Sequence, residues 1–237
     1  MRRLLPNRRP ILAALAAVAL AACGGADPRP AARGDAVPVV ATVASPPGVA
    51  SDRLRAGDLA GARAAFEAAL AAHPDRLAAL NDLAVSYFLE GHAEAARRLL
   101  DEVVASGTAR EQQAALVNLG ELYAADGYVS AAQAYLETAR AIDPARPEAW
   151  YALALLADGR GDAERSRAAL AEALRLDDGG AARAAFAYVY SEERLHLEAL
   201  IAEHGGDRAE AAARWRELSS GRFAALAAAA ERHLAGE

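Results

Sequence analysis

The chain has 237 residues, of which 54% are hydrophobic and 24% are charged, and its formal net charge is −6. An acidic chain repels phosphate backbones and anionic lipid headgroups, which argues against nucleic-acid binding and against charge-driven attachment to membranes. The single cysteine, Cys23, excludes an intramolecular disulfide.

Residues 1–22 have the pattern of a bacterial export signal. Four arginines precede the apolar run at residues 11–22, which is too short to span a bilayer. The run ends in Leu20-Ala21-Ala22-Cys23, which resembles the lipobox of bacterial lipoproteins. This resemblance implies cleavage before Cys23 and attachment of the protein to a membrane through acyl chains, such as palmitate, on Cys23. The alternative is an ordinary secretory signal followed by a free cysteine.

The residue after the lipobox cysteine indicates which membrane is involved. Gly24 is not the aspartate that keeps many Gram-negative lipoproteins at the inner membrane, so the resemblance implies the periplasmic face of the outer membrane. Removal of residues 1–22 leaves 22 basic against 32 acidic residues, a net charge of −10. Attachment of so acidic a protein would depend on its acyl chains, and stable anchoring requires more than one chain.

Residues 23–47, which begin with the lipidated cysteine, are predicted to form a flexible linker. They are rich in Gly, Ala and Pro and lack helical periodicity. At about 3.1 Å per residue, an extended linker would reach roughly 70 Å from the membrane. The run from Val37 to Val43 favours β structure, so a short strand or a partner-docking segment is the alternative there.

From residue 48 onward, apolar residues follow a helical period and a motif recurs. Its clearest copy consists of Leu116, Leu119, Gly120, Tyr123, Gly127, Ala132, Leu136, Ala139 and Pro144. This spacing resembles the tetratricopeptide repeat, in which about 34 residues form two antiparallel helices. A turn glycine recurs in register at Gly57, Gly91, Gly127, Gly161 and Gly206.

The resemblance implies an all-α, right-handed superhelical solenoid of four to five helix-turn-helix repeats in a domain at residues 48–237. The expected units are 48–76, 77–112, 113–146, 147–180 and a degenerate unit at 181–220, followed by a capping helix at 221–235. The fourth unit departs from the family pattern at Ala157, where tyrosine is usual. The first helix of the fifth unit is predicted to run through residues 181–204, longer than a repeat helix.

No arrangement of residues predicts catalysis, so we expect a protein that is not an enzyme and that needs no metal or cofactor. The five histidines include no HExxH pair. His196 and His204 are interpreted as surface histidines of a long helix. Glu192 and Glu193 are neighbours whose side chains diverge by about 100° on a helix, which argues against a glycosidase pair.

Repeats of this family line a concave groove with their first helices and bind partner peptides there. The repeat register predicts that the groove is lined by Asn81, Val85, Phe88, Leu89, Val117, Asn118, Glu121, Tyr151, Leu155 and Asp158. Several of these are apolar, and Asn118 offers hydrogen bonds to a peptide backbone, which favours an extended or helical partner segment. The alternative is that the apolar side chains pack against the next helix.

These patterns predict a lipid-anchored periplasmic scaffold that binds a segment of a periplasmic or outer-membrane protein during assembly of an envelope complex. In length and anchor the chain resembles lipoproteins that assist type IV pilus secretins, lipoproteins of gliding-motility complexes, and the repeat subunit of the outer-membrane β-barrel assembly machine. The alternative function is a regulatory adaptor of a peptidoglycan hydrolase or synthase. The sequence does not predict the oligomeric state.

Overall fold

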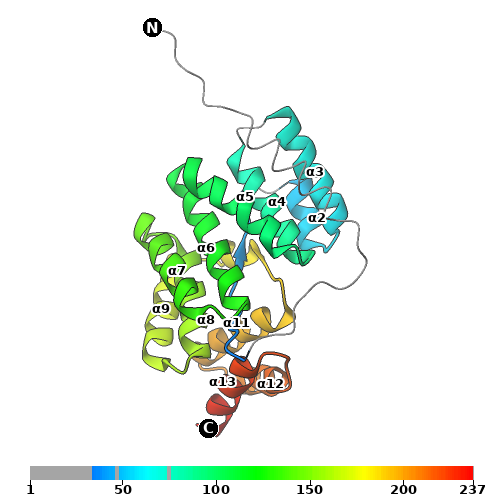
Figure 1. Cartoon of the computed structure of the whole chain (residues 1–237). Helices are drawn as coiled ribbons and strands as arrows, with labels where there is room; N and C mark the ends of the chain where they lie inside the picture. Colours follow the sequence, from blue (N-terminus) through cyan, green and yellow to red (C-terminus); the bar gives the residue numbers. More distant parts are fainter. Residues whose placement is uncertain (1–33, 46–47, 74–75, 237) are drawn as a thin grey trace.

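The computed structural model describes residues 34–45, 48–73 and 76–236, which form an all-α solenoid of paired helices (Figure 1). The predicted fold class is therefore confirmed. Residues 1–33, with the expected export signal, Cys23 and the first part of the expected linker, lie outside the described residues. The predictions made for them stay predictions.

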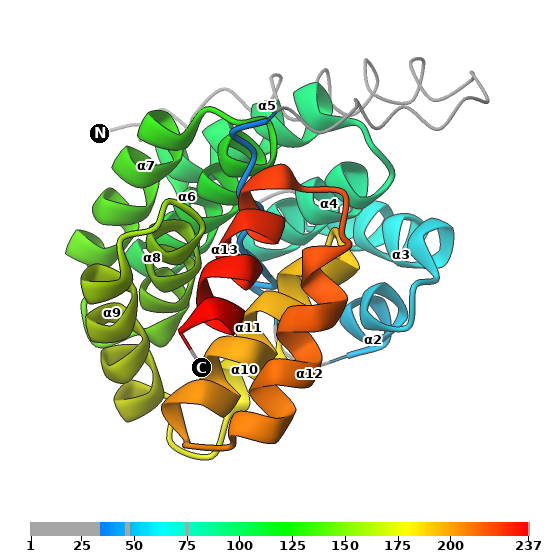
Figure 2. The same ribbon diagram turned by 90° about the horizontal axis from the view of Figure 1, so that it is seen from below.

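The first four units are antiparallel pairs of helices. These pairs are α2 (Val49–Arg55) with α3 (Leu59–Ala72), α4 (Leu77–Leu89) with α5 (Ala93–Ser106), α6 (Ala109–Ala125) with α7 (Val129–Ile142), and α8 (Pro147–Gly159) with α9 (Ala163–Leu176). The C-terminal part contains α10 (Ala181–Ala184), α11 (Ser191–His204), α12 (Arg208–Ser219) and α13 (Ala224–Ala235). Helices α2 to α9 form an arc that curves around α11 and α13 (Figure 2).

Glycines at fixed positions of the motif shape these pairs. The five turn glycines all have φ between 78° and 84°, the left-handed region in which a side chain is strained. Gly120 has a different role, because a Cβ atom there would lie 2.5 Å from Cδ2 of Leu136. A side chain at position 120 would therefore prevent the observed close packing of α6 against α7.

The prediction of one long helix at residues 181–204 is wrong. Helix α10 ends at Ala184, a short strand β2 (Phe186–Ala187) follows, and α11 begins only at Ser191. The carboxylate of Glu193 accepts hydrogen bonds from the backbone N–H groups of Val189 (2.8 Å) and Tyr190 (3.0 Å). This capping fixes the start of α11 and separates it from the strand.

The prediction of a flexible linker is also wrong for residues 34–45. Strand β1 (Ala41–Thr42) pairs with β2 in an antiparallel register that places Ala41 opposite Ala187 and Thr42 opposite Phe186. The short strand that the β-prone run offered as an alternative is the observed structure. Burial of a valine stabilises a fold by about 1.5–3 kcal/mol, and Val37, Val39 and Val40 are all buried.

Candidate peptide-binding groove

The inner side of the solenoid holds an extended segment of the chain itself, residues 36–45. Strand β1 packs against α4 and α6, the first helices of the second and third units. The side chains of residues 36, 37, 39, 40 and 41 are almost completely shielded from solvent and belong to the hydrophobic core. The inner surface on which the groove was predicted is therefore covered by the chain's own N-terminal segment.

Two asparagines bind the middle of this segment through its backbone. The N–H group of Thr42 donates to Oδ1 of Asn118 at 2.7 Å. The carbonyl oxygen of Thr42 accepts hydrogen bonds from Nδ2 of Asn118 at 3.0 Å and from Nδ2 of Asn81 at 3.2 Å. Nδ2 of Asn118 also donates to Oδ1 of Asn81 at 2.9 Å, which links the two helices. Both asparagines were predicted to line a groove for a partner, and here they bind residue 42 of the chain itself.

Two acidic side chains bind the segment on either side of Thr42. Asp82 accepts hydrogen bonds from the N–H groups of Ala44 (2.6 Å) and Ser45 (2.9 Å). Glu121 accepts a hydrogen bond from the N–H group of Val39. These hydrogen bonds come from backbone N–H groups of the segment, which would allow an extended chain of many sequences to form them.

Sequence reasoning did not identify Asp82 as a groove residue. The sequence feature that could have identified it is an aspartate within the otherwise apolar helix 77–89. A carboxylate buried in such a helix needs hydrogen-bond donors. Burial raises the pKa of Asp82, and the hydrogen bonds from residues 44, 45 and 81 partly oppose that rise. A buried acceptor of this kind requires the segment's N–H groups as partners.

The predicted apolar groove residues belong to the same hydrophobic core as the segment. The predicted residues Val85, Phe88, Leu89 and Val117 are all buried. At Gly159, the end of α8, a Cβ atom would lie 2.3 Å from Cγ1 of Val37. The wall therefore accepts small and β-branched side chains in an extended conformation. Binding of a partner by these residues stays a prediction.

Glu121, which accepts from Val39, and Glu193, which accepts from Val189 and Tyr190, are two buried carboxyl groups that influence each other's pKa. Burial raises the pKa of Glu121 to about 7, although the N–H group of Val39 lowers it. Burial, and then the charge of Glu121, raise the pKa of Glu193 well above its ordinary value. Two adjacent carboxyls that share a proton avoid the repulsion of two buried negative charges.

Comparison with known families supports the repeat assignment. Family models described as "Tetratricopeptide repeat" match residues 53–119, and also residues 114–146 and 147–179, which together cover more than half of the chain. The chain belongs to the tetratricopeptide repeat family. No curated protein sequence matches it.

Two crystal structures of MamA resemble this tetratricopeptide repeat protein. Each is 21% identical to it. One aligns with a TM-score of 0.43 and covers 81% of this chain and 100% of the MamA chain. The other has a TM-score of 0.41 and covers 80% of this chain and 92% of the MamA chain.

The family match ends at residue 179, and the part of this tetratricopeptide repeat protein beyond it covers one end of the groove. The O–H group of Tyr151 donates to Oδ2 of Asp177 at 3.1 Å, and its oxygen accepts a hydrogen bond from Arg183 at 2.8 Å. The edge of the Phe186 ring packs on Tyr151, with ring centres 5.6 Å apart. Leu155 is fully buried. These residues of the fourth unit hold the C-terminal elements in place.

The last predicted groove residue, Asp158, binds two histidines. It lies 2.8 Å from Nε2 of His196 on α11 and 2.8 Å from Nε2 of His233 on α13. His196 is completely buried, so its interpretation as a surface histidine is wrong. The interpretation failed because it placed His196 on a long helix with one exposed face, whereas α11 packs inside the arc. Asp158 serves to attach the C-terminal helices to α8.

The described residues contain no group of three or more His, Cys, Asp and Glu side chains arranged to hold a metal ion. None of the helices in that part of the chain combines the length and hydrophobicity needed to cross a bilayer.

Proposed function

We propose that this tetratricopeptide repeat protein is a non-enzymatic scaffold whose groove binds an extended segment of a partner polypeptide. Residues 36–45 fill the groove until the partner's segment replaces them. The observation that carries the proposal is the set of side chains that bind the backbone of residues 39–45. Protein–protein interaction is the general role of tetratricopeptide repeats. In this protein the groove has side chains placed to bind the backbone of an extended segment.

The structure of the bound segment defines the partner's chemistry. A competing segment must be extended, so that its N–H groups reach Asp82, Asn118 and Glu121, and it must carry small or β-branched apolar side chains. A charged side chain at the position of Val40 would be buried without a partner, which costs several kcal/mol. We therefore propose a partner segment that resembles Ala36–Thr42 and carries no charge at its centre.

The proposal includes a location at the periplasmic face of the outer membrane, through a lipid on Cys23. There the scaffold would hold a segment of a periplasmic or outer-membrane protein during assembly of a secretin, motility or outer-membrane complex. The lipobox-like residues 20–23 support the location. Because the chain is acidic, charge alone would not hold it on anionic lipid, so the proposed location depends on the lipid.

The Cys23→Ser variant tests the anchor. Without the thiol, no acyl chain can be attached, so the variant is expected to remain unprocessed or to become soluble. Membrane fractionation and intact-mass analysis after expression in a Gram-negative host would check this. A variant that is cleaved and bound to membranes at wild-type levels would contradict the lipid anchor and leave the groove proposal untouched.

The Val40→Asp variant tests the groove. A buried aspartate is expected to drive residues 36–45 out of the groove and to leave it open. A fluorescent peptide with the sequence of residues 34–45 should then bind the variant at least about tenfold more tightly than the wild-type chain, because the binding-competent fraction rises. Fluorescence anisotropy with the full-length Cys23→Ser chain as background measures both affinities.

Two controls make this test specific. Val49→Asp places the same substitution at an exposed valine with 69% of its surface accessible, and it should leave peptide affinity at the wild-type value. The peptide that itself carries Val40→Asp should not bind the opened variant. Equal binding of the unmodified peptide to the Val40→Asp and Val49→Asp chains would refute a replaceable segment.

A further inference from the structure

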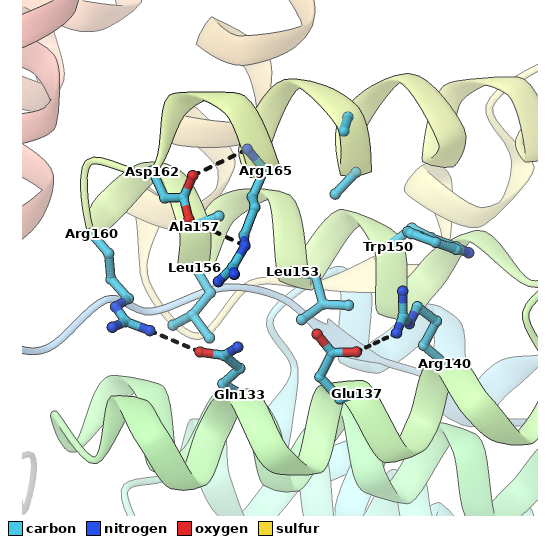
Figure 3. A pocket seen from close by; sticks show the side chains of 12 residues that line it. Gln133, Glu137, Arg140, Trp150, Leu153, Leu156, Ala157, Arg160, Asp162 and Arg165 are labelled. Carbon is cyan, nitrogen blue, oxygen red and sulfur yellow. Dashed lines mark hydrogen bonds and ion pairs between the residues drawn. The ribbon is translucent and has the colours of Figure 1, made fainter.

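The junction between the third and fourth units contains a pocket that is separate from the peptide-binding groove (Figure 3). It has a volume of about 340 Å³, and its walls come from α7, α8 and α9. Leu153, Leu156 and Ala157 of α8 form an apolar wall, and Arg165 extends toward Leu156 from α9. None of the groove residues described above lines this pocket.

The preceding junction of the solenoid has aromatic side chains at the positions equivalent to this pocket. There the ring of Tyr123 stacks on Tyr135, with centres 5.2 Å apart and planes at 19°. The edge of the Tyr128 ring packs against Tyr123, with centres 6.1 Å apart and planes at 71°. Three tyrosine rings thus pack together at this junction between repeats.

The three tyrosines are absent from the next repeat. One period of 34 residues after Tyr123, Tyr128 and Tyr135 come Ala157, Asp162 and Ala169. All three of these smaller residues line the pocket. The pocket is therefore the space of a tyrosine cluster that this junction lacks, and the shape of the surrounding helices is suited to aromatic rings.

The rim of the pocket favours an aromatic ring over an aliphatic side chain. Arg160 and Arg165 lie at the mouth beside the apolar wall, and the guanidinium group of Arg140 lies 5.0 Å from the ring centre of Trp150. A guanidinium group is attracted to the face of an aromatic ring. An apolar cavity of about 150 Å³ suffices to bind benzene, so the observed volume is enough for a tyrosine side chain.

We propose that this pocket is a second docking site, which takes a tyrosine side chain from a partner polypeptide. The inserted ring would occupy the space between Ala157 and Ala169 that Tyr123 and Tyr135 fill in the preceding repeat. Binding at this outer junction does not require release of residues 36–45. A partner could therefore attach here while the groove is closed.

The probe is N-acetyl-tyrosinamide, observed through the indole N–H group of Trp150 by NMR. The chain has two tryptophans, and Trp215 is buried against His233 away from the pocket, so it serves as an internal reference. We expect a saturable shift of the Trp150 signal and none of the Trp215 signal. The same titration with N-acetyl-leucinamide should give binding several-fold weaker, because a guanidinium group gains nothing from an aliphatic side chain.

The double variant Ala157→Tyr with Ala169→Tyr restores the two rings and should weaken binding of the tyrosine probe at least about tenfold, since the site is filled. Ala171→Tyr is the matched control, because it adds a ring to an exposed position of α9 outside the pocket and should leave binding unchanged. Arg165→Ala, a substitution of an exposed rim residue, should weaken binding about 2- to 5-fold. If circular dichroism shows that the double variant does not fold, the Arg165→Ala variant tests whether the tyrosine probe binds in this pocket.

Several results would overturn the proposal. These are the absence of a saturable Trp150 shift, binding to the double variant equal to that of the Ala171→Tyr control, and equal affinities for the tyrosine and leucine probes. Tighter binding of p-cresol than of a blocked Gly-Tyr-Gly peptide would overturn it in favour of a free aromatic ligand. None of these results depends on the state of the peptide-binding groove.

Discussion

The Asp158→Ala variant is expected to lose about 3–5 kcal/mol of unfolding free energy, the usual effect of removing one partner from a buried ionic network. Asp158 is buried and bonds both His196 and His233. Nδ1 of His233 also lies 2.8 Å from Glu203, and its ring stacks on Trp215 with centres 4.1 Å apart. Without Asp158, both histidines lose their shared partner inside the arc of helices.

Urea unfolding followed by circular dichroism measures this loss, and limited proteolysis shows where the structure opens. We expect early cleavage next to α13, because the variant loses the contact of His233 with the Asp158 side chain and keeps only the hydrogen bond from Arg232 to the backbone oxygen of residue 158. Asp178→Ala is the matched control, since Asp178 is exposed, and it should change stability by less than about 0.5 kcal/mol. If the two variants unfold at the same urea concentration, Asp158 does not hold the C-terminal helices.

The repeat architecture was predictable because each unit carries its own local signals. Glycines such as Gly91 and Gly127 mark the turn, and their backbone angles do not depend on distant contacts. The third unit begins two residues later than the repeat period requires, and there the Thr108 and Glu111 side chains form a capping box that starts α6. Local chemistry of this kind is readable from a single sequence.

The content of the groove was not predictable in the same way. Asn81 and Asn118 were predicted to line it, but the residue that they bind lies in a segment without helical periodicity. That segment is ordered by pairing with Phe186 and Ala187, which are more than 140 positions further along the chain. Residues 34–45 were predicted to be part of a linker from their composition, and composition contains no information about such long-range contacts. The error at His196 has the same origin, since its burial depends on contacts with Asp158 of α8 and Trp215 of α12, which are distant in the sequence.

The free energy of unfolding is expected to fall as the pH rises from about 5.5 to 8.5. Burial raises the pKa of Glu121 to about 7, so the folded chain holds a proton that the unfolded chain has already released. Stability from this proton is complete below the unfolded pKa and is lost as the pH passes the folded pKa, a loss on the order of 3 kcal/mol. Asp126 adds a negative charge near Glu121 and acts in the same direction.

His233 contributes a decline in the same direction. Burial alone would lower the pKa of His233, but its hydrogen bond to Asp158 and the charges of Asp158 and Glu203 raise it. Because the folded pKa exceeds the unfolded one, this contribution too is present at low pH and disappears as the pH rises through the folded pKa. The two sources can be separated by substitution at Glu121.

Glu121→Gln should reduce the decline between pH 5.5 and 8.5 to less than half of the wild-type decline. The amide oxygen can still accept the hydrogen bond from the N–H group of Val39, and the amide N–H₂ group can donate to Glu193 without a shared proton. Urea titrations at a series of pH values measure the effect, with the exposed Glu231→Gln as the control that should follow the wild type. Stability that stays constant or rises over this range in the wild type would show that Glu121 and Glu193 do not share a proton. Persistence of the full decline in Glu121→Gln would assign it to Glu193 and His233 instead.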